Sequence, residues 1–251
     1  MFSVAYVIRT DELSEAYDSL LMTSGFLDEV PKRVYIWTWV TIALHNAVQG
    51  FMVTALLEGT IHDKASDRIS LIAHPDKLKE LQKLIEKGKE WGTAYDKVRW
   101  MHTASRLFAM IQDPKVMTEQ QGGTPVEVSD VQELSFTILN RTRNEFIHSK
   151  PSDLALIVDG FDWEPIHCAE VLEKLIFKSG TISFGPRDDF QPFDADDVRQ
   201  LLAKLREQGQ ALNEWYHAET VVFDATWNLQ PHPRHTLLVG HHIDHCGVEW
   251  G

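Results

Sequence analysis

Three residues near the end of one helical stretch have side chains that could do chemistry together. Arg143, Asn144 and His148 precede Pro151, and a proline disfavours the helical conformation of the residue before it. Asn144 and His148 are four residues apart, so they share one face of a helix. Arginine can bind an anion through two hydrogen bonds, and histidine can accept or donate a proton near neutral pH. We therefore interpret these residues as a candidate site for a small anion.

Arg143 is predicted to lie at the centre of an apolar stripe of the same helix. At about 100° per residue, the apolar neighbours that fall within about 60° of it are Phe136, Leu139, Phe146 and Ile147. Burying a guanidinium without a partner is costly. We expect either an ion pair, with Glu145 or with a residue of the central helix, or a stripe that opens onto a cleft or a subunit interface. Arg141 and Lys150 add positive charge close by.

The acidic composition limits how the chain can attract phosphates. Its 251 residues are 43% hydrophobic, enough for a globular core, and carry a formal net charge of -13. Any contact with RNA must therefore depend on a local cluster of Arg and Lys. The two cysteines, Cys168 and Cys246, predict no disulfide framework. Together with the lack of a signal-peptide pattern, they favour a cytoplasmic protein.

Residues 34–57 contain no charged side chain and are long enough to cross a membrane. Polar residues nevertheless recur on one helical face, namely Thr38, Thr41, His45 and Gln49. Because unpaired polar groups are costly in lipid, we predict a buried core helix with one polar seam and no membrane span. His45 and Asn46 are candidate contacts for RNA or phosphate, although a hydrogen-bonded polar pair of the core is the alternative.

Hydrophobic periodicity predicts a mainly α fold. The expected helices cover residues 12–23, 31–58, 75–87, 95–112, 129–150, 165–178 and a last stretch after residue 194. Ser129 and Gln132 form a capping-box pattern at the start of the helix that carries the candidate site.

The segments between and after these helices are predicted to be less regular. We expect a loop over 114–125, short strands at 154–158 and 181–185, and irregular chain from about residue 218. Residues 1–215 are assigned to one helical domain and residues 216–251 to a C-terminal extension. Histidines and Cys246 in this extension include types that bind zinc, at positions 232, 235, 241, 242, 245 and 246. Their order matches no known zinc motif, so we interpret a solvated tail and expect neither metal nor cofactor.

The series Arg143-Asn144-x-x-x-His148 resembles the Arg-x4–6-His signature of the HEPN superfamily of helical ribonucleases. The long helix that holds His45 and Asn46, and the position of the series at a late helix end, also resemble that superfamily. A short strand and a further helix after the motif are similar to a plasmid-associated branch of it. The resemblance covers roughly residues 30–180 in order and spacing.

The resemblance implies an antiparallel helical bundle and a metal-independent endoribonuclease that works as a two-fold dimer. The two motif helices would face each other across one composite cleft. Arg143 would bind the phosphate, His148 would act as general acid and base, and Asn144 would orient either the imidazole or the phosphate. Such enzymes are used as toxins or in phage defence, and a neutralising or regulatory partner protein is implied. The alternative is a catalytically inactive dimer that binds RNA or nucleotide, or serves as a scaffold.

Overall fold

The structure is a computed structural model that describes residues 11–57, 83, 86–87, 102–148, 163–185 and 192–226, without the side chains of 34, 148 and 217–226. Within these ranges the fold is mainly α and contains no strand. The α-helices are α1 (Glu12–Glu29), α2 (Trp37–Leu57), α6 (Ala104–Met110), α7 (Asp130–His148), α8 (Trp163–Phe177) and α9 (Ala195–Thr226). A 3₁₀ turn, η1 (Val34–Ile36), leads into α2, and a π-helical segment, η2 (Lys115–Gln120), follows α6.

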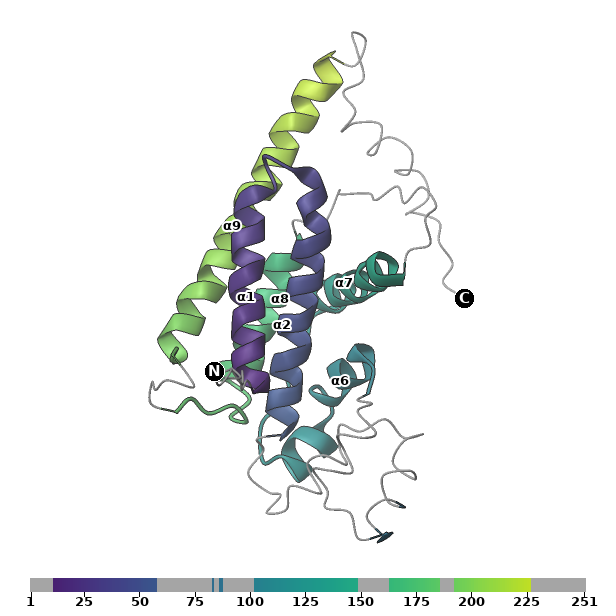
Figure 1. Ribbon diagram of the computed structural model, residues 1–251, viewed down its shortest axis with the longest axis vertical. Helices are drawn as coiled ribbons and strands as arrows, with labels where there is room; N and C mark the ends of the chain where they lie inside the picture. Colours follow the sequence, from purple (N-terminus) through teal and green to yellow (C-terminus); the bar gives the residue numbers. More distant parts are fainter. Residues whose placement is uncertain are drawn as a thin grey trace, which may run out of the picture.

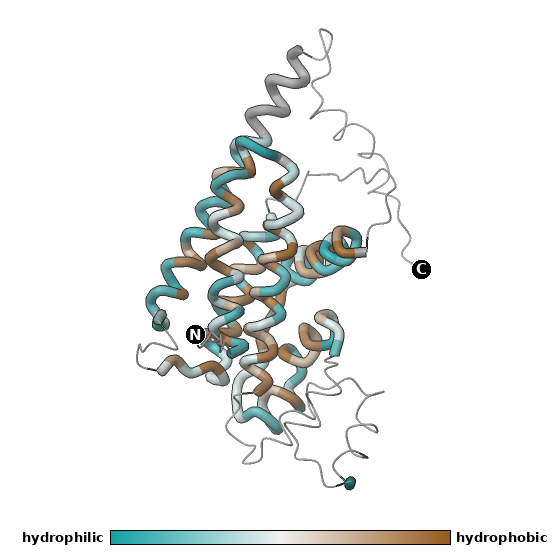
Figure 2. The backbone as a smooth tube through the Cα atoms, viewed as in Figure 1, coloured by the Kyte–Doolittle hydropathy of each residue, from teal (hydrophilic) through white to brown (hydrophobic). Residues whose placement is uncertain are grey.

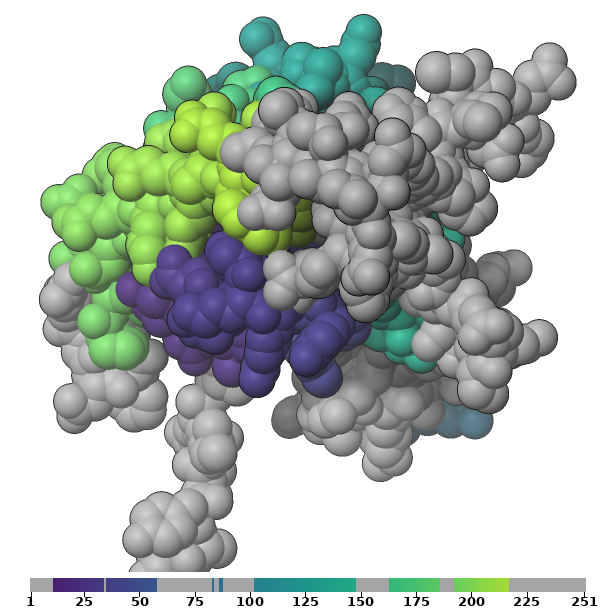
Figure 3. Space-filling model, turned by 90° about the horizontal axis from the view of Figure 1, so that it is seen from above, coloured from purple at the N-terminus to yellow at the C-terminus, as the bar shows by residue number. Residues whose placement is uncertain are grey.

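The helices α1 and α2 form a hairpin with the most extensive helix–helix contact in the described part of the chain (Figure 1). The two backbones approach closely where Gly50 of α2 faces Ala16 of α1. The long helix α9 packs along α1 and α8, and Figure 3 shows α1, α2 and α9 side by side from the hairpin end. Hydrophilic residues recur along α9 between hydrophobic ones, as Figure 2 shows, which is the pattern of a helix with one buried face.

Two glycines offer a matched test of this hairpin. Replacing Gly25 by alanine should raise the free energy of unfolding by about 0.5–1 kcal/mol, because an added Cβ there meets nothing within 4 Å and alanine favours the helix. Replacing Gly50 by alanine should lower it by about 1–2 kcal/mol despite the same gain in propensity. Its Cβ would lie 2.8 Å from the Cβ of Ala16, so the helices must move apart. Urea unfolding of both variants measures the difference, and equal shifts would contradict the close approach.

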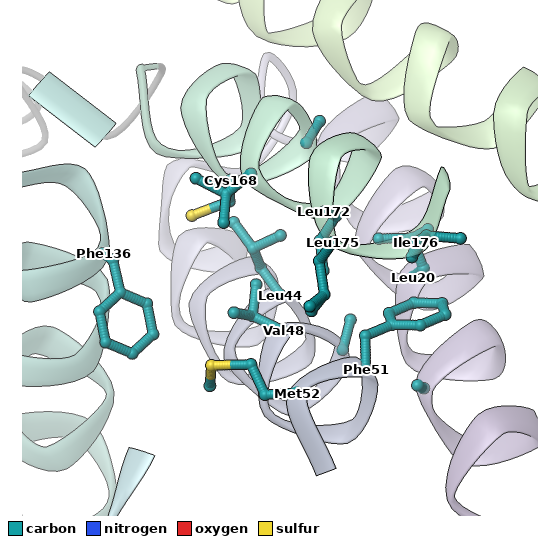
Figure 4. Close-up of a cluster of buried hydrophobic side chains, with 14 of the residues drawn as sticks. Leu20, Leu44, Val48, Phe51, Met52, Phe136, Cys168, Leu172, Leu175 and Ile176 are labelled. Carbon is teal, nitrogen blue, oxygen red and sulfur yellow. The ribbon is translucent and has the colours of Figure 1, made fainter. Parts of the chain in front are cut away.

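The core is organised around α2. Its buried side chains include Leu44, Val48, Phe51 and Met52, which Figure 4 shows between residues of α1, α7 and α8. By length and composition α2 could cross a membrane, but 72% of its most apolar window is buried inside the protein. Thr41 and His45 of the predicted polar seam are also buried. This is the environment predicted for a core helix.

The helix α7 lies across α2 rather than along it (Figure 1). Phe136 in the middle of α7 is buried, and its ring stacks on Phe108 of α6 with centroids 3.9 Å apart. On its other side α7 packs against α8. The middle of α7 is therefore held by three neighbouring helices, and its last turns carry the candidate site.

Several predicted boundaries are wrong in detail. Helix α1 continues to Glu29, and α2 begins at Trp37 rather than at residue 31 because the 3₁₀ turn intervenes. The loop predicted over 114–125 contains the π-helical segment, whose Val116 and Met117 are buried. Apolar residues at neighbouring positions allowed this short segment to pack against the core, whereas its glycines and prolines had suggested an open loop.

The strand predicted at residues 181–185 is wrong. The structure has a turn there, with Gly180 at φ 74° and the Ser179 hydroxyl hydrogen bonded to Leu175 O and to the hydroxyl of Thr181. The amide of Thr124 donates to Ser179 O at 2.7 Å, which ties the turn to the segment after η2. The prediction of irregular chain from about residue 218 is wrong for residues 218–226, because α9 continues to Thr226; residues 227–251 lie outside the described residues. The strand at 154–158 and the helix over 75–87 lie outside the described residues, apart from 83, 86 and 87.

Candidate functional site

The predicted capping box fixes the start of α7. The Ser129 amide donates to Gln132 Oε1 at 3.1 Å, and the Gln132 amide donates to Ser129 Oγ at 3.4 Å. The side-chain amide of Gln132 also donates to Glu170 of α8 at 2.8 Å, and Lys174 donates to Gln132 Oε1 at 3.0 Å. These contacts anchor the first turn of α7 on α8, so the register of its last turns is fixed as well.

Near the other end of α7 only one of two arginines is neutralised by a neighbour. Arg141 Nε lies 2.9 Å from Glu145 Oε1, a pair of residues four apart on the exposed face. Arg143 has no carboxylate within ion-pair distance among the residues that the structure describes. The predicted pairing of Arg143 with Glu145 is therefore wrong, because residues two apart point to different sides of a helix.

Arg143 is half-buried against its own chain. Its neighbours on the apolar stripe, Phe136 and Leu139, are buried in the core, whereas Ile147 is exposed. Its Nη1 donates to Asn144 Oδ1 at 3.0 Å, and its Nε is buried without a hydrogen-bond partner. No described carboxylate therefore neutralises this guanidinium at the edge of the core, and a bound anion could act as its partner.

The helix α2 places His45 next to α7, close to Arg143. His45 is 2% exposed, and its Nε2 lies 3.0 Å from Asn140 Oδ1 on α7. Asn140 Nδ2 in turn donates to Ser105 Oγ on α6 at 3.1 Å. Burial lowers the pKa of His45 from 6.5 to about 4, the hydrogen bond to Asn140 opposes this, and the charge of Arg143 lowers it further. His45 is therefore a neutral imidazole at physiological pH.

Among the described residues, three buried polar atoms of α2 and α7 have no hydrogen-bond partner. They are Thr41 Oγ1, His45 Nδ1 and Arg143 Nε. Thr41 is one turn before His45 on the same face of α2, and Arg143 is one turn after Asn140 on α7. Such an atom costs about 1–3 kcal/mol in a folded protein. The atoms of His45 and Arg143, two residues close enough for their charges to interact, are therefore candidate contacts for a bound group.

The structure brings together part of the predicted site. Arg143 of α7 lies close enough to His45 of α2 for its charge to act on the ring, and Asn144 is hydrogen bonded to Arg143. Asn46 is exposed next to His45 on α2. Arg141 is on the exposed face, in its pair with Glu145. Helix α7 ends at His148, whose side chain lies outside the described residues, as does Lys150.

Two site residues were not predicted, Asn140 and Ser105. Asn140 precedes Arg143 by three residues, which is the spacing of neighbours along one helix face, and this spacing could have indicated it. Ser105 lies 35 residues away in sequence, on another helix, and no local pattern indicates it.

The outward face of α7 carries an exposed apolar stripe. Its members are Val131, Leu134 and Ile138, with exposed fractions of 54%, 56% and 38%. They are spaced by three and four residues, so they form one continuous strip along the helix. Arg141 and Glu145 continue the same strip toward the end of α7. This is the face of the motif helix that other molecules can reach.

Within the described ranges, no group of three or more His, Cys, Asp or Glu side chains could hold a metal ion. Cys168 is buried, and burial, together with the nearby charge of Glu164, raises the pKa of its thiol well above the ordinary value. It is therefore an inert core residue. The histidines of the C-terminal extension and Cys246 lie outside the described residues.

Comparisons with protein-family models, with curated proteins and with solved structures find no match for this chain.

Proposed function

We propose that this protein is a metal-independent endoribonuclease of the HEPN type, with its site at the end of α7. The observation that carries the proposal is the half-buried Arg143, which has no carboxylate partner in the described part of the chain and presents Nη1 beside the exposed Asn144. An RNA phosphate is an anion that fits such a guanidinium. The local charge of Arg143 supplies what the acidic chain as a whole does not.

The reaction would use the RNA's own 2′-hydroxyl as nucleophile. His148, the last residue of α7, would take the proton of this hydroxyl as its oxygen bonds to phosphorus. The bond to the 5′-oxygen of the next nucleotide then breaks, and that oxygen receives a proton. Arg143 would stabilise the charge that develops on the phosphate oxygens, and Asn144 would orient Arg143 through their hydrogen bond. DNA lacks the 2′-hydroxyl and would not be cleaved.

The active form would be a dimer in which two copies of α7 meet. The exposed Ile147 supports this arrangement, because it follows Arg143 by one turn on the same side of α7, and an apolar side chain there favours a partner over water. Lys150, Asn46 and Arg141 would contact the RNA beyond the cleaved bond. A neutralising or regulatory protein partner, as in toxin or phage-defence systems, would cover the same site.

The test is cleavage of a single-stranded RNA in the presence of EDTA. Wild type should cleave it, and His148→Ala should lower the rate by about 10²–10⁴-fold. The matched DNA oligonucleotide should stay intact. Cleavage that continues in His148→Ala, or that stops on addition of EDTA, would overturn the mechanism.

The same assay tests the dimer. Mixing the inactive variants His148→Ala and Arg143→Ala should restore part of the activity, because a mixed dimer holds one intact copy of each residue. No restoration after subunit exchange would mean that each protomer acts alone. RNA binding without cleavage by wild type would leave a binding module as the function, since the same guanidinium would hold the phosphate in both cases.

A further inference from the structure

Three helices meet at one asparagine beside the candidate site. The Oδ1 atom of Asn140, on α7, lies 3.0 Å from Nε2 of His45 on α2. Its Nδ2 atom donates a hydrogen bond of 3.1 Å to Oγ of Ser105 on α6. Arg143 follows one turn later on α7. Asn140 therefore holds the helix in place immediately before the arginine.

The orientation of the Asn140 amide fixes the proton on His45. Since Nδ2 donates to Ser105, the oxygen faces His45, and His45 Nε2 must carry the hydrogen. In a neutral ring Nδ1 is then a bare acceptor, and it is buried without a partner. A second proton would place a positive charge in the core close to Arg143, a cost that the neighbouring Asn46 side chain offsets only in part. If the amide of Asn140 were turned the other way, its nitrogen would donate to His45 Nε2. The hydrogen of the neutral ring would then be on Nδ1, which is buried.

An uncharged residue at position 140 has a consequence for Arg143. An aspartate there would make the same hydrogen bond to His45, but its charge would neutralise the guanidinium from inside the protein. The isosteric asparagine gives the geometry without the charge. Arg143 consequently keeps its charge for a partner outside the fold, and its Nε has no acceptor within the described part of the chain.

We propose that Asn140, held between His45 and Ser105, is a positioning residue that orients the last turns of α7 and, by lacking a charge, leaves Arg143 available to an external phosphate. The proposal rests on the proposed function in that both require an anion at Arg143. It goes further, because it assigns roles to Asn140 and to a neutral His45.

The experiment compares Asn140→Asp, Asn140→Ala and Ser105→Ala with wild type. Binding of a short single-stranded RNA oligonucleotide is measured by titration, and the nitrogen chemical shifts of the His45 ring are measured by NMR at pH 7. In wild type we expect the neutral ring with hydrogen on Nε2. In Asn140→Asp the ring should carry both protons, and RNA affinity should fall by about 10-fold or more, with the variant still folded at the assay temperature in a thermal unfolding scan.

The other two variants separate position from charge. Asn140→Ala should weaken RNA binding while leaving the His45 ring neutral, because the helix loses its tether but gains no charge. Ser105→Ala removes one of the two hydrogen bonds that hold Asn140, so it should weaken RNA binding in the same direction as Asn140→Ala but by a smaller factor, with the His45 ring still neutral. Wild-type affinity in Asn140→Asp, or a protonated His45 in wild type at pH 7, would overturn the proposal.

The outcomes separate this proposal from the proposed function. If wild type binds RNA with these variant effects but never cleaves it, the positioning role stands and the ribonuclease function fails. If wild type cleaves RNA and Asn140→Asp cleaves it equally well, the function stands and the positioning role fails. If wild type binds no RNA, both fail.

Discussion

Replacing Arg143 by alanine should lower the rate of RNA cleavage by about 10²–10³-fold, the loss typical when one group that stabilises transition-state charge is removed. The guanidinium has no internal counter-ion among the described residues, so its charge is directed at the substrate. Arg141→Ala is the matched control, because Arg141 is on the same helix but exposed and paired with Glu145. Arg141 is proposed to contact RNA beyond the cleaved bond, so Arg141→Ala should weaken RNA binding but change the cleavage rate of bound RNA by less than about 3-fold. Single-turnover cleavage of one RNA by the three proteins measures both.

The variant Arg143→Met separates function from folding. It keeps much of the side chain's apolar length and removes a half-buried charge that lacks a carboxylate partner in the described part of the protein. The free energy of unfolding should stay the same or rise. In wild type the charge of Arg143 loses part of its solvation on folding without gaining an ion pair, and methionine removes that cost. Activity should still fall as in Arg143→Ala. A large loss of stability in Arg143→Met would mean that the arginine serves the fold, and the proposed site would then be wrong.

The helical wheel correctly predicted which apolar residues of α7 lie beside Arg143, but not which part of the protein packs against them. Phe136 and Leu139 on its stripe are buried, as the periodicity indicated. The stripe was expected to open onto a cleft or a subunit interface, yet the ring of Phe136 packs on Phe108 of the same chain. Which helices cover a given face depends on long-range pairing, and periodicity within one helix carries no information about it.

Ion pairs within one helix can be predicted from the sequence, whereas contacts between helices cannot. The spacing of Arg141 and Glu145 by four residues is the one that allows a pair, so the charge of Glu145 was never available to Arg143. The link from His45 to Asn140 joins residues 95 positions apart. Polar residues on α2 were predicted as a seam, but their partner depended on the way α7 crosses α2.

The C-terminal half shows where local patterns mislead. Alternating residues at 181–185 predicted a strand, but no described segment offers a partner edge, and the Ser179 side chain caps the end of α8 instead. Helix α9 continues past residue 218 because helix formation is cooperative, and each added residue extends an existing hydrogen-bonded turn. Both errors arise where a short window was interpreted without its neighbours.

Lowering the pH should destabilise the protein through His45. Its pKa falls from 6.5 to about 4 on folding, first because burial disfavours the charged ring, while the hydrogen bond to Asn140 opposes the shift and Arg143 adds to it. Between these two pH values the unfolded chain binds a proton that the folded protein does not. The stability is therefore fully present above pH 6.5 and is lost progressively toward pH 4, by about 3 kcal/mol. Below pH 4 this contribution changes no further.

The variant His45→Gln isolates this contribution from those of other histidines. Glutamine is neutral at every pH and removes the titrating ring, so its unfolding free energy should lack this part of the pH dependence. At pH 7 the variant should be less stable than wild type, because a buried hydrogen bond to Asn140 is weakened or lost. Urea unfolding at pH 7, 6, 5 and 4 should show the gap shrinking as wild type loses stability. A gap that stays constant would mean that folding does not lower the pKa of His45. Below about pH 6.5, Arg143 would then face a second positive charge at the site where it is proposed to bind phosphate.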